Sequence, residues 1–298
     1  MYEENAKIFR SNNTRVVHKI GQIVKLTLTQ MAKFETITFQ WIAGGSQMFR
    51  WVLVGLAGWF LALTATAEFR IDNDVQGVKS TAFLLEGKFY SMIGDNGEIV
   101  EFEATTRTFT LIDPALRIQT QIDAQETRQR VEQLRQQILN DPNAKTDSFR
   151  YFAFKPAFTS EFDAVSGKLA LQSHWIDYEI RTIPFTDPSA RAYYDFCDWV
   201  CYLNFRLNPG SSQMLIRLEV NRLLREGQRF AVNVSESLYP GGKQKFARPY
   251  RVSSSHEIVR RLGDTDRRRI EQAQEFKRIL PQVPFDEYQR RVAERMFR

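Results

Sequence analysis

The fold is decided by the segment TFTLIDPALRIQTQI, residues 108–122. Apolar and polar residues alternate in it on both sides of Asp113-Pro114, which is a turn signal. Successive strand residues point to opposite faces of a sheet, so the alternation predicts two paired antiparallel strands. Similar short runs lie upstream, separated by the turn signals Glu86-Gly87-Lys88 and 94–97. We therefore predict a β-meander over residues 69–122.

After this meander the apolar period changes from 2 to 3.6. Asp123 as N-cap and Glu126 three residues later predict a helix that ends at Asp141-Pro142. Asp187-Pro188 predicts the start of another helix, and Gly227 is expected at C′ of the helix after it. Further strands are expected at 158–172, 175–183, 228–237 and 248–260, and helices at 187–206, 211–225, 264–280 and 285–297. The predicted fold class is α+β, with a large curved antiparallel sheet, half-barrel-like, and helices on one face.

Residues 48–67 have the pattern of a secretory signal peptide. Met48, Phe49 and Arg50 form a short n-region, residues 51–67 carry no charge, and Ala65-Thr66-Ala67 is a small-x-small cleavage site. We expect cleavage after Ala67 and a periplasmic or secreted product. The alternative is an uncleaved membrane anchor formed by residues 51–67, which is at the lower limit of length for spanning a bilayer.

Three regions follow from this interpretation. Residues 1–47 are long for an n-region, and we expect them to be a non-native extension, with translation starting at Met48. Residues 48–67 are the signal peptide, and residues 68–298 form a single exported α+β domain. Membrane contact is expected only through the signal sequence or an uncleaved anchor.

The charge balance argues against a nucleic-acid partner. The chain has 41 Lys and Arg against 35 Asp and Glu, but residues 1–67 hold seven of the basic and three of the acidic ones. Residues 68–298 therefore keep 34 basic and 32 acidic residues, and the basic pI belongs largely to the region expected to be removed. We expect no general nucleic-acid binding.

The densest local feature is the run YYDFCDWVCYL, residues 193–203. On a helix, Phe196, Cys197, Val200 and Cys201 share one face. This face is a core face or a lid over a ligand cavity, with Phe196, Trp199 and Val200 as the lid residues; a metal or redox pair is a further alternative. Cysteines four apart on a helix are too distant for disulfide geometry, so we expect two buried free thiols.

Signals for catalysis and cofactors are weak. Ser254 lies on the same strand face as His256, but no G-x-S-x-G elbow is present and one such pair is no triad. The sequence has no phosphate loop, dinucleotide fingerprint or metal-ligand spacing. We expect that the protein is not an enzyme and that it binds no cofactor and no metal. A hydrolase is a remote alternative.

The order of a signal peptide, a β-meander containing TFTLIDPALRIQTQI, a capped helix, further strands and a C-terminal basic helix resembles uncharacterised exported bacterial proteins. In architecture it also resembles the outer-membrane lipoprotein carriers, the LolA/LolB-like half-barrels. The resemblance covers most of residues 68–260 as a pattern of elements, and no functional motif matches.

Two functions are left open. One is non-enzymatic binding of a lipid or other apolar ligand, or of a lipoprotein, in a pocket of the curved sheet lined by Phe83, Phe89, Phe102 and Phe109. The other is an envelope structural or interaction protein without a small ligand, which is expected to have a solid core.

Overall fold

The computed structural model describes residues 68–94, 97–143, 146, 148–208, 212–239, 242–243 and 248–296. Eleven strands form one open antiparallel sheet in the order β6-β5-β4-β3-β2-β1-β11-β10-β9-β8-β7. The strands are β1 (Phe69–Val75), β2 (Val78–Leu85), β3 (Lys88–Ile93), β4 (Ile99–Glu103), β5 (Thr108–Asp113), β6 (Ile118–Asp123), β7 (Thr159–Asp163), β8 (Lys168–Gln172), β9 (Ile176–Pro184), β10 (Arg229–Leu238) and β11 (Tyr250–Val259). The six helices are α3 (Ala124–Asn140), α4 (Phe149–Phe154), α5 (Pro188–Leu207), α6 (Gln213–Glu226), α7 (Asp264–Ile279) and α8 (Phe285–Met296). The predicted α+β class with a large antiparallel sheet is confirmed.

The sheet consists of two meanders that meet where β1 pairs with β11. Two-residue turns connect the first strands of the first meander. Gln76-Gly77 joins β1 to β2 and Glu86-Gly87 joins β2 to β3, and all four residues have positive φ. Such two-residue turns match the twist of the paired strands. Residues far apart in sequence thus become neighbours, and Asn73 lies directly opposite His256.

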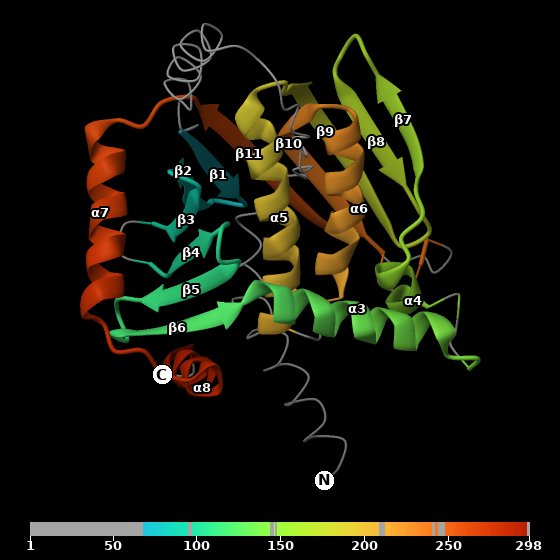
Figure 1. Ribbon diagram of the computed structural model, residues 1–298. Helices are drawn as coiled ribbons and strands as arrows, with labels where there is room; N and C mark the ends of the chain where they lie inside the picture. The colour runs from blue at the N-terminus through green and yellow to red at the C-terminus, as the bar shows by residue number, and fades with distance from the viewer. Residues whose placement is uncertain are drawn as a thin grey trace, which may run out of the picture.

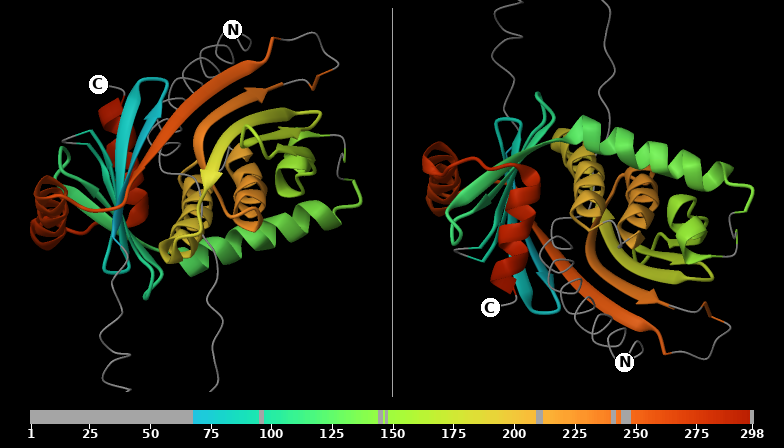
Figure 2. Two further views of the ribbon diagram at one scale, coloured as in Figure 1. Left: turned by 90° about the horizontal axis from the view of Figure 1, so that it is seen from above. Right: turned by 90° about the horizontal axis from the view of Figure 1, so that it is seen from below.

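One face of the sheet is covered by α3, α4, α5 and α6. The strands β9, β10 and β11 curve around α5 and α6, which are inserted as a helical hairpin between β9 and β10 (Figures 1 and 2). We call this the concave face. Its core is rich in aromatic rings: Phe89 on β3 stacks on Phe196 of α5 with centroids 4.4 Å apart.

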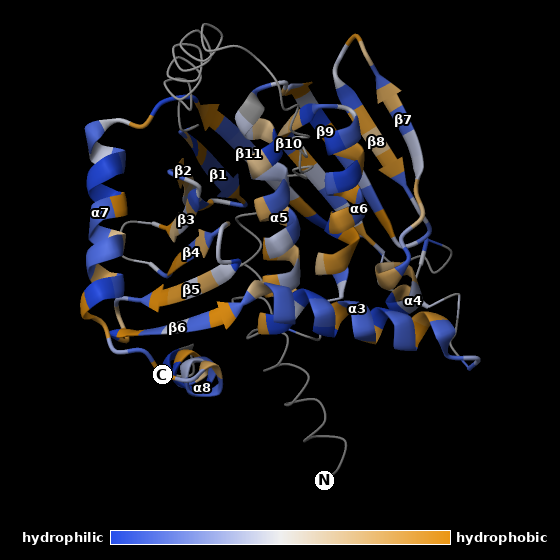
Figure 3. Cartoon of the chain, viewed as in Figure 1, coloured by the Kyte–Doolittle hydropathy of each residue, from blue (hydrophilic) through white to orange (hydrophobic). Residues whose placement is uncertain are grey.

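Helix α7 packs on the opposite face of the N-terminal strands (Figure 2). The sequence predicted helices on one face, and α7 departs from this because β2 to β5 carry buried apolar residues on both faces. Phe83, Tyr90 and Ile112 pack with Ile270 of α7 in a cluster separate from the concave core. The outer surfaces of α3 and α7 are largely hydrophilic (Figure 3).

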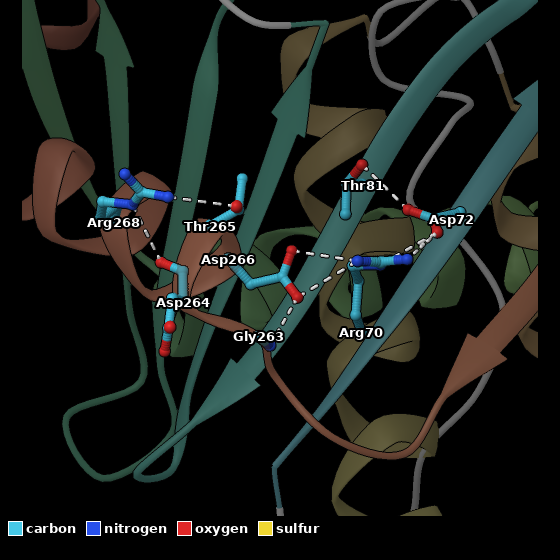
Figure 4. Close-up of polar contacts among 8 residues, drawn as sticks. All are labelled: Arg70, Asp72, Thr81, Gly263, Asp264, Thr265, Asp266 and Arg268. Atoms are coloured by element: carbon cyan, nitrogen blue, oxygen red, sulfur yellow. Dashed lines mark hydrogen bonds and ion pairs between the residues drawn. The ribbon is translucent and has the colours of Figure 1, made fainter.

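A buried carboxylate fixes the start of α7 (Figure 4). Asp266 accepts a hydrogen bond from the Gly263 N–H at 3.0 Å and forms an ion pair with Arg70 of β1 at 3.1 Å. Arg70 also pairs with Asp72 at 3.0 Å. A carboxylate in the first turn of a helix complements the helix dipole and offsets the nearby arginines.

The C-terminal segment protects the edge of the sheet at β6. Gln119 forms a parallel bridge with Gln282, and its side-chain amide donates to the carbonyl oxygens of Lys277 and Leu280 at 2.7 and 2.6 Å. In α8, the Tyr288 hydroxyl donates to Glu98, and Arg295 donates to Asp113 at 2.9 Å.

The structure agrees with the predicted starts of two helices. Asp123 accepts from the Glu126 N–H at 2.8 Å and Asp187 accepts from the Ser189 N–H at 2.8 Å, so both N-caps are confirmed. The assignment of Gly227 to C′ is wrong: its φ is −76° in the right-handed region, and the residue with positive φ is Gln228, at 49°. The segment 148–155, ambiguous in sequence, contains α4.

The predicted extension 1–47 and signal peptide 48–67 lie outside the described residues. Among the helices that the structure describes, none combines the length and the apolar character needed to cross a membrane.

Candidate functional site

A small cavity lies on the concave face, between the first turns of α6 and strands β1, β10 and β11. Its volume is about 40 Å³, which holds about three water molecules. We call it the Arg217 pocket; its lining combines four apolar side chains with polar and charged ones: Val75, Gln213, Met214, Arg217, Val234, Glu236, Val252, Ser254 and His256.

The back wall of the pocket is a chain of three hydrogen-bonded side chains. Ser254 Oγ lies 3.0 Å from His256 Nε2, and His256 Nδ1 lies 2.7 Å from Asn73 Oδ1. Asn73 Oδ1 can only accept, so His256 carries its proton on Nδ1 and accepts from the Ser254 hydroxyl at Nε2. Asn73 in turn donates to Ser80 at 3.4 Å. The expectation that Ser254 and His256 share a strand face is confirmed.

The charge state of His256 follows from its surroundings. Burial, with the positive charge of Arg217 as a second cause, lowers the pKa of His256 to about 3. The imidazole is therefore neutral near pH 7.

The neutral state of His256 is relevant to the alternative that the protein is a hydrolase. A serine nucleophile requires a base that can take its proton and hold it as an imidazolium. His256 would form that cation near Arg217, and the partner of its Nδ1 is the neutral amide of Asn73. Efficient general bases have a pKa near the working pH, and the pKa of His256 lies well below neutral pH.

Arg217 supplies the charge of the pocket. Burial lowers the pKa of Arg217, but Tyr178 and Glu236 more than offset this, and the net shift is upward. The guanidinium thus remains charged; its Cζ lies 5.5 Å from the Tyr178 ring centroid. Glu236, half-buried on β10, lines the same pocket. Charged groups with shifted pKa values in a cavity are a recurring feature of functional sites.

The four phenylalanines expected to line a ligand pocket lie elsewhere. Phe89, Phe102 and Phe109 are buried in the concave core, whereas Phe83 lies on the opposite face, under α7. Phe83 departs from the set because the alternation of β2 points Ala82 and Leu84 to the concave side. None of the four lines the Arg217 pocket.

The three proposed lid residues lie on α5 and face the sheet. Phe196 and Val200 are buried in the concave core, and Trp199 is partly buried with its ring centroid 6.1 Å from that of Phe102. Cys197 and Cys201 are buried free thiols, as predicted. Burial raises the pKa of the Cys201 thiol far above its usual value, so this sulfur is not a reactive thiolate.

Within the described residues, no group of three or more His, Cys, Asp or Glu side chains could hold a metal ion. No protein-family model and no curated protein matches the chain.

Sequence reasoning missed Asn73 and Arg217. Asn73 reaches His256 only through the pairing of β1 with β11, which joins residues 183 apart. Arg217 lies on a helix with several other arginines, and the sequence does not distinguish the one that faces the sheet. A polar residue in the apolar pattern of β1, Asn73 between Ile71 and Val75, was the one available signal.

Proposed function

We propose that this chain is an exported, non-enzymatic binding protein for a lipid or another ligand with an apolar chain. The observation that carries the proposal is the Arg217 pocket, a cavity with apolar and charged side chains at the boundary between the curved sheet and the inserted hairpin α5–α6. Ligand sites combine an apolar wall with a few convergent polar groups, and this pocket has both.

The hairpin α5–α6 is the proposed cover of the ligand site. Both of its connections to the sheet lie at one end, where the Phe185 N–H donates to the Gln228 carbonyl oxygen at 2.8 Å. The pocket lies toward the other end, at the first turns of α6. A small rotation of the hairpin about residues 185–188 and 227–228 would widen the space between Met214 and the valines of the sheet. Hinges of this kind are a few residues at the ends of elements.

The size of the cavity decides what the closed state can hold. About 40 Å³ accommodates a polar group of about three heavy atoms but no acyl chain. The chain of the ligand must therefore displace side chains along the α6–sheet boundary, and we propose that binding is coupled to this opening.

The test is direct binding of laurate to the full chain, measured by equilibrium dialysis. Val252→Trp places a ring in the pocket from a partly exposed position of β11; Ser253→Trp is the matched control, since Ser253 is exposed on the opposite face of the same strand. We expect saturable binding by the wild type, a loss of at least tenfold for Val252→Trp and no change for Ser253→Trp. Absence of saturable binding by the wild type, or equal binding by the two variants, would contradict the proposal.

The filled concave core supports a second candidate, an envelope structural or interaction protein without a small ligand. Phe89 stacks on Phe196 inside this core, and neither ring lines the Arg217 pocket. This candidate predicts that no laurate binds and that the chain is purified without any adduct.

A further inference from the structure

We propose that the Arg217 pocket binds an acidic head group, so that the ligand is an anionic amphiphile such as a fatty acid. This inference rests on the proposed function, because it assigns the polar end of the same ligand. Three properties of the pocket lead to it: the position of its cation, the apolar side chains that border it and its size.

The cation of the pocket is Arg217, on α6. Arg217 projects from the second turn of α6 into a pocket whose other helix residues, Gln213 and Met214, are uncharged. A guanidinium presents several N–H donors in one plane, and this fork matches the two oxygens of a carboxylate or phosphate. Such charge-assisted bonds are about twice as strong as neutral ones.

Arg217 is the charge that acts on the wall formed by His256 and Ser254. Arg217 acts on His256 and disfavours its cationic form, and no acidic group is among the causes of its lowered pKa. The first turn of α6 adds a partial positive charge, since it holds no acidic residue and Ser212 makes no side-chain capping bond. A cationic head group would be repelled by Arg217, which is the second cause, after burial, of the lowered pKa of His256.

Glu236 is the opposing charge, and it provides a control. It lies on β10 opposite Tyr178 of β9 and raises the pKa of Arg217, so it faces the guanidinium from the side of β10. A bound anion is therefore attracted by Arg217 and repelled by Glu236. Removing each charge in turn should shift the affinity for an anion in opposite directions.

The size of the pocket limits the ligand to one small acidic head group. A volume of about 40 Å³ is enough for a carboxylate and too small for a sugar head group. The apolar side chains Val75, Met214, Val234 and Val252 border the cavity, so the chain of the amphiphile meets an apolar boundary directly beyond its head.

The experiment compares three ligands with the same twelve-carbon chain by isothermal titration calorimetry on the full chain: laurate, dodecanol and dodecylammonium. Since a hydrogen bond to a charged group is worth about tenfold or more in affinity, the wild type should bind laurate at least tenfold more tightly than the other two. Arg217→Met should remove this preference while the affinity for dodecanol is kept. Arg217→Lys should keep part of it.

Glu236→Gln keeps the shape of the pocket and should increase the affinity for laurate severalfold. Because Glu236 is half-buried and leaves Arg217 in place, this variant tests the assignment even if Arg217→Met fails to fold, which circular dichroism would detect. A decrease in laurate affinity with Glu236→Gln would overturn the inference.

The outcomes separate this inference from the function on which it rests. If none of the three ligands binds, the proposed function fails. If all three bind with equal affinity, the proposed function stands and the acidic head group is excluded. Inorganic phosphate and acetate serve as chain-free anions: binding of either one as tightly as laurate would show a free-anion site and overturn the assignment to an amphiphile.

Discussion

His256 Nδ1 lies 2.7 Å from Asn73 Oδ1. This hydrogen bond connects β1 and β11, which are the first and last strands in the sequence and neighbours in the middle of the sheet. It lies on the concave face, where the two meanders meet, and it fixes the orientation of the imidazole that accepts from Ser254. The same contact therefore joins the two halves of the fold and shapes the wall of the Arg217 pocket.

The stability of the protein should depend on pH through His256. The folded-state pKa of His256, about 3, lies below its ordinary value of 6.5. The stabilising effect is complete above pH 6.5, and is lost as the pH falls from 6.5 toward 3, by about 1.4 kcal/mol for each pH unit. Urea denaturation between pH 4 and pH 8 would measure this slope. His256→Gln should be less sensitive to pH in this range, and an identical slope in both proteins would contradict the assignment.

Replacing Asn73 by aspartate should raise the pKa of His256. Asn73→Asp keeps the shape of the side chain and places a carboxylate beside the imidazole, which favours the imidazolium form. An NMR titration of the His256 ring protons should show an increase of at least one pH unit relative to the wild type. Asn73→Ala is the control, since it removes the hydrogen bond without adding charge. An unchanged pKa in Asn73→Asp would mean that the two side chains are not in contact.

The contact between α5 and the sheet should carry a large part of the stability. Phe196 is 1% exposed and stacks on Phe89, so Phe196→Ala should cost about 3–5 kcal/mol. Phe162 is the control: it is 42% exposed on β7, and Phe162→Ala should cost less than about 1 kcal/mol. Chemical denaturation measures both. Equal losses would show that α5 is not packed on the sheet in solution.

The carboxylate of Asp266 should be needed for the attachment of α7, whereas its neighbour Asp264 should not. Asp266 is buried and bonded to Arg70 and to the Gly263 N–H, while Asp264 is exposed in the same helical turn (Figure 4). Asp266→Ala should cost about 1–3 kcal/mol, since it leaves Arg70 and a backbone donor with fewer partners. Asp264→Ala should cost less than about 0.5 kcal/mol. Thermal denaturation of the two variants distinguishes them, and the reverse order would contradict the role of Asp266.

Local signals predicted the elements of this fold well. The caps at Asp123 and Asp187 and the turn at Glu86-Gly87 depend on contacts within a few residues, so the sequence contains all of their determinants. The end of α6 was misjudged because glycine is preferred at positive φ but not required there, and Gln228 takes that conformation.

Long-range pairing limited what could be predicted of the site. Phe83 was grouped with Phe89, Phe102 and Phe109 by residue type, but the register of β2 points it to the face covered by α7. Asn73 and His256 are neighbours only because β1 and β11 pair in one register. Ser254 and His256 share a strand, and their proximity was the one feature of the site that local geometry could predict.

The central claim, that the chain binds an amphiphile under α6, is tested most directly by native mass spectrometry of the full chain purified without detergent. The account predicts a one-to-one adduct with the mass of an acyl-chain compound in the wild type and in Ser253→Trp, and its loss in Val252→Trp. Detection of the bare chain alone in the wild type, with no adduct after addition of laurate, would contradict it.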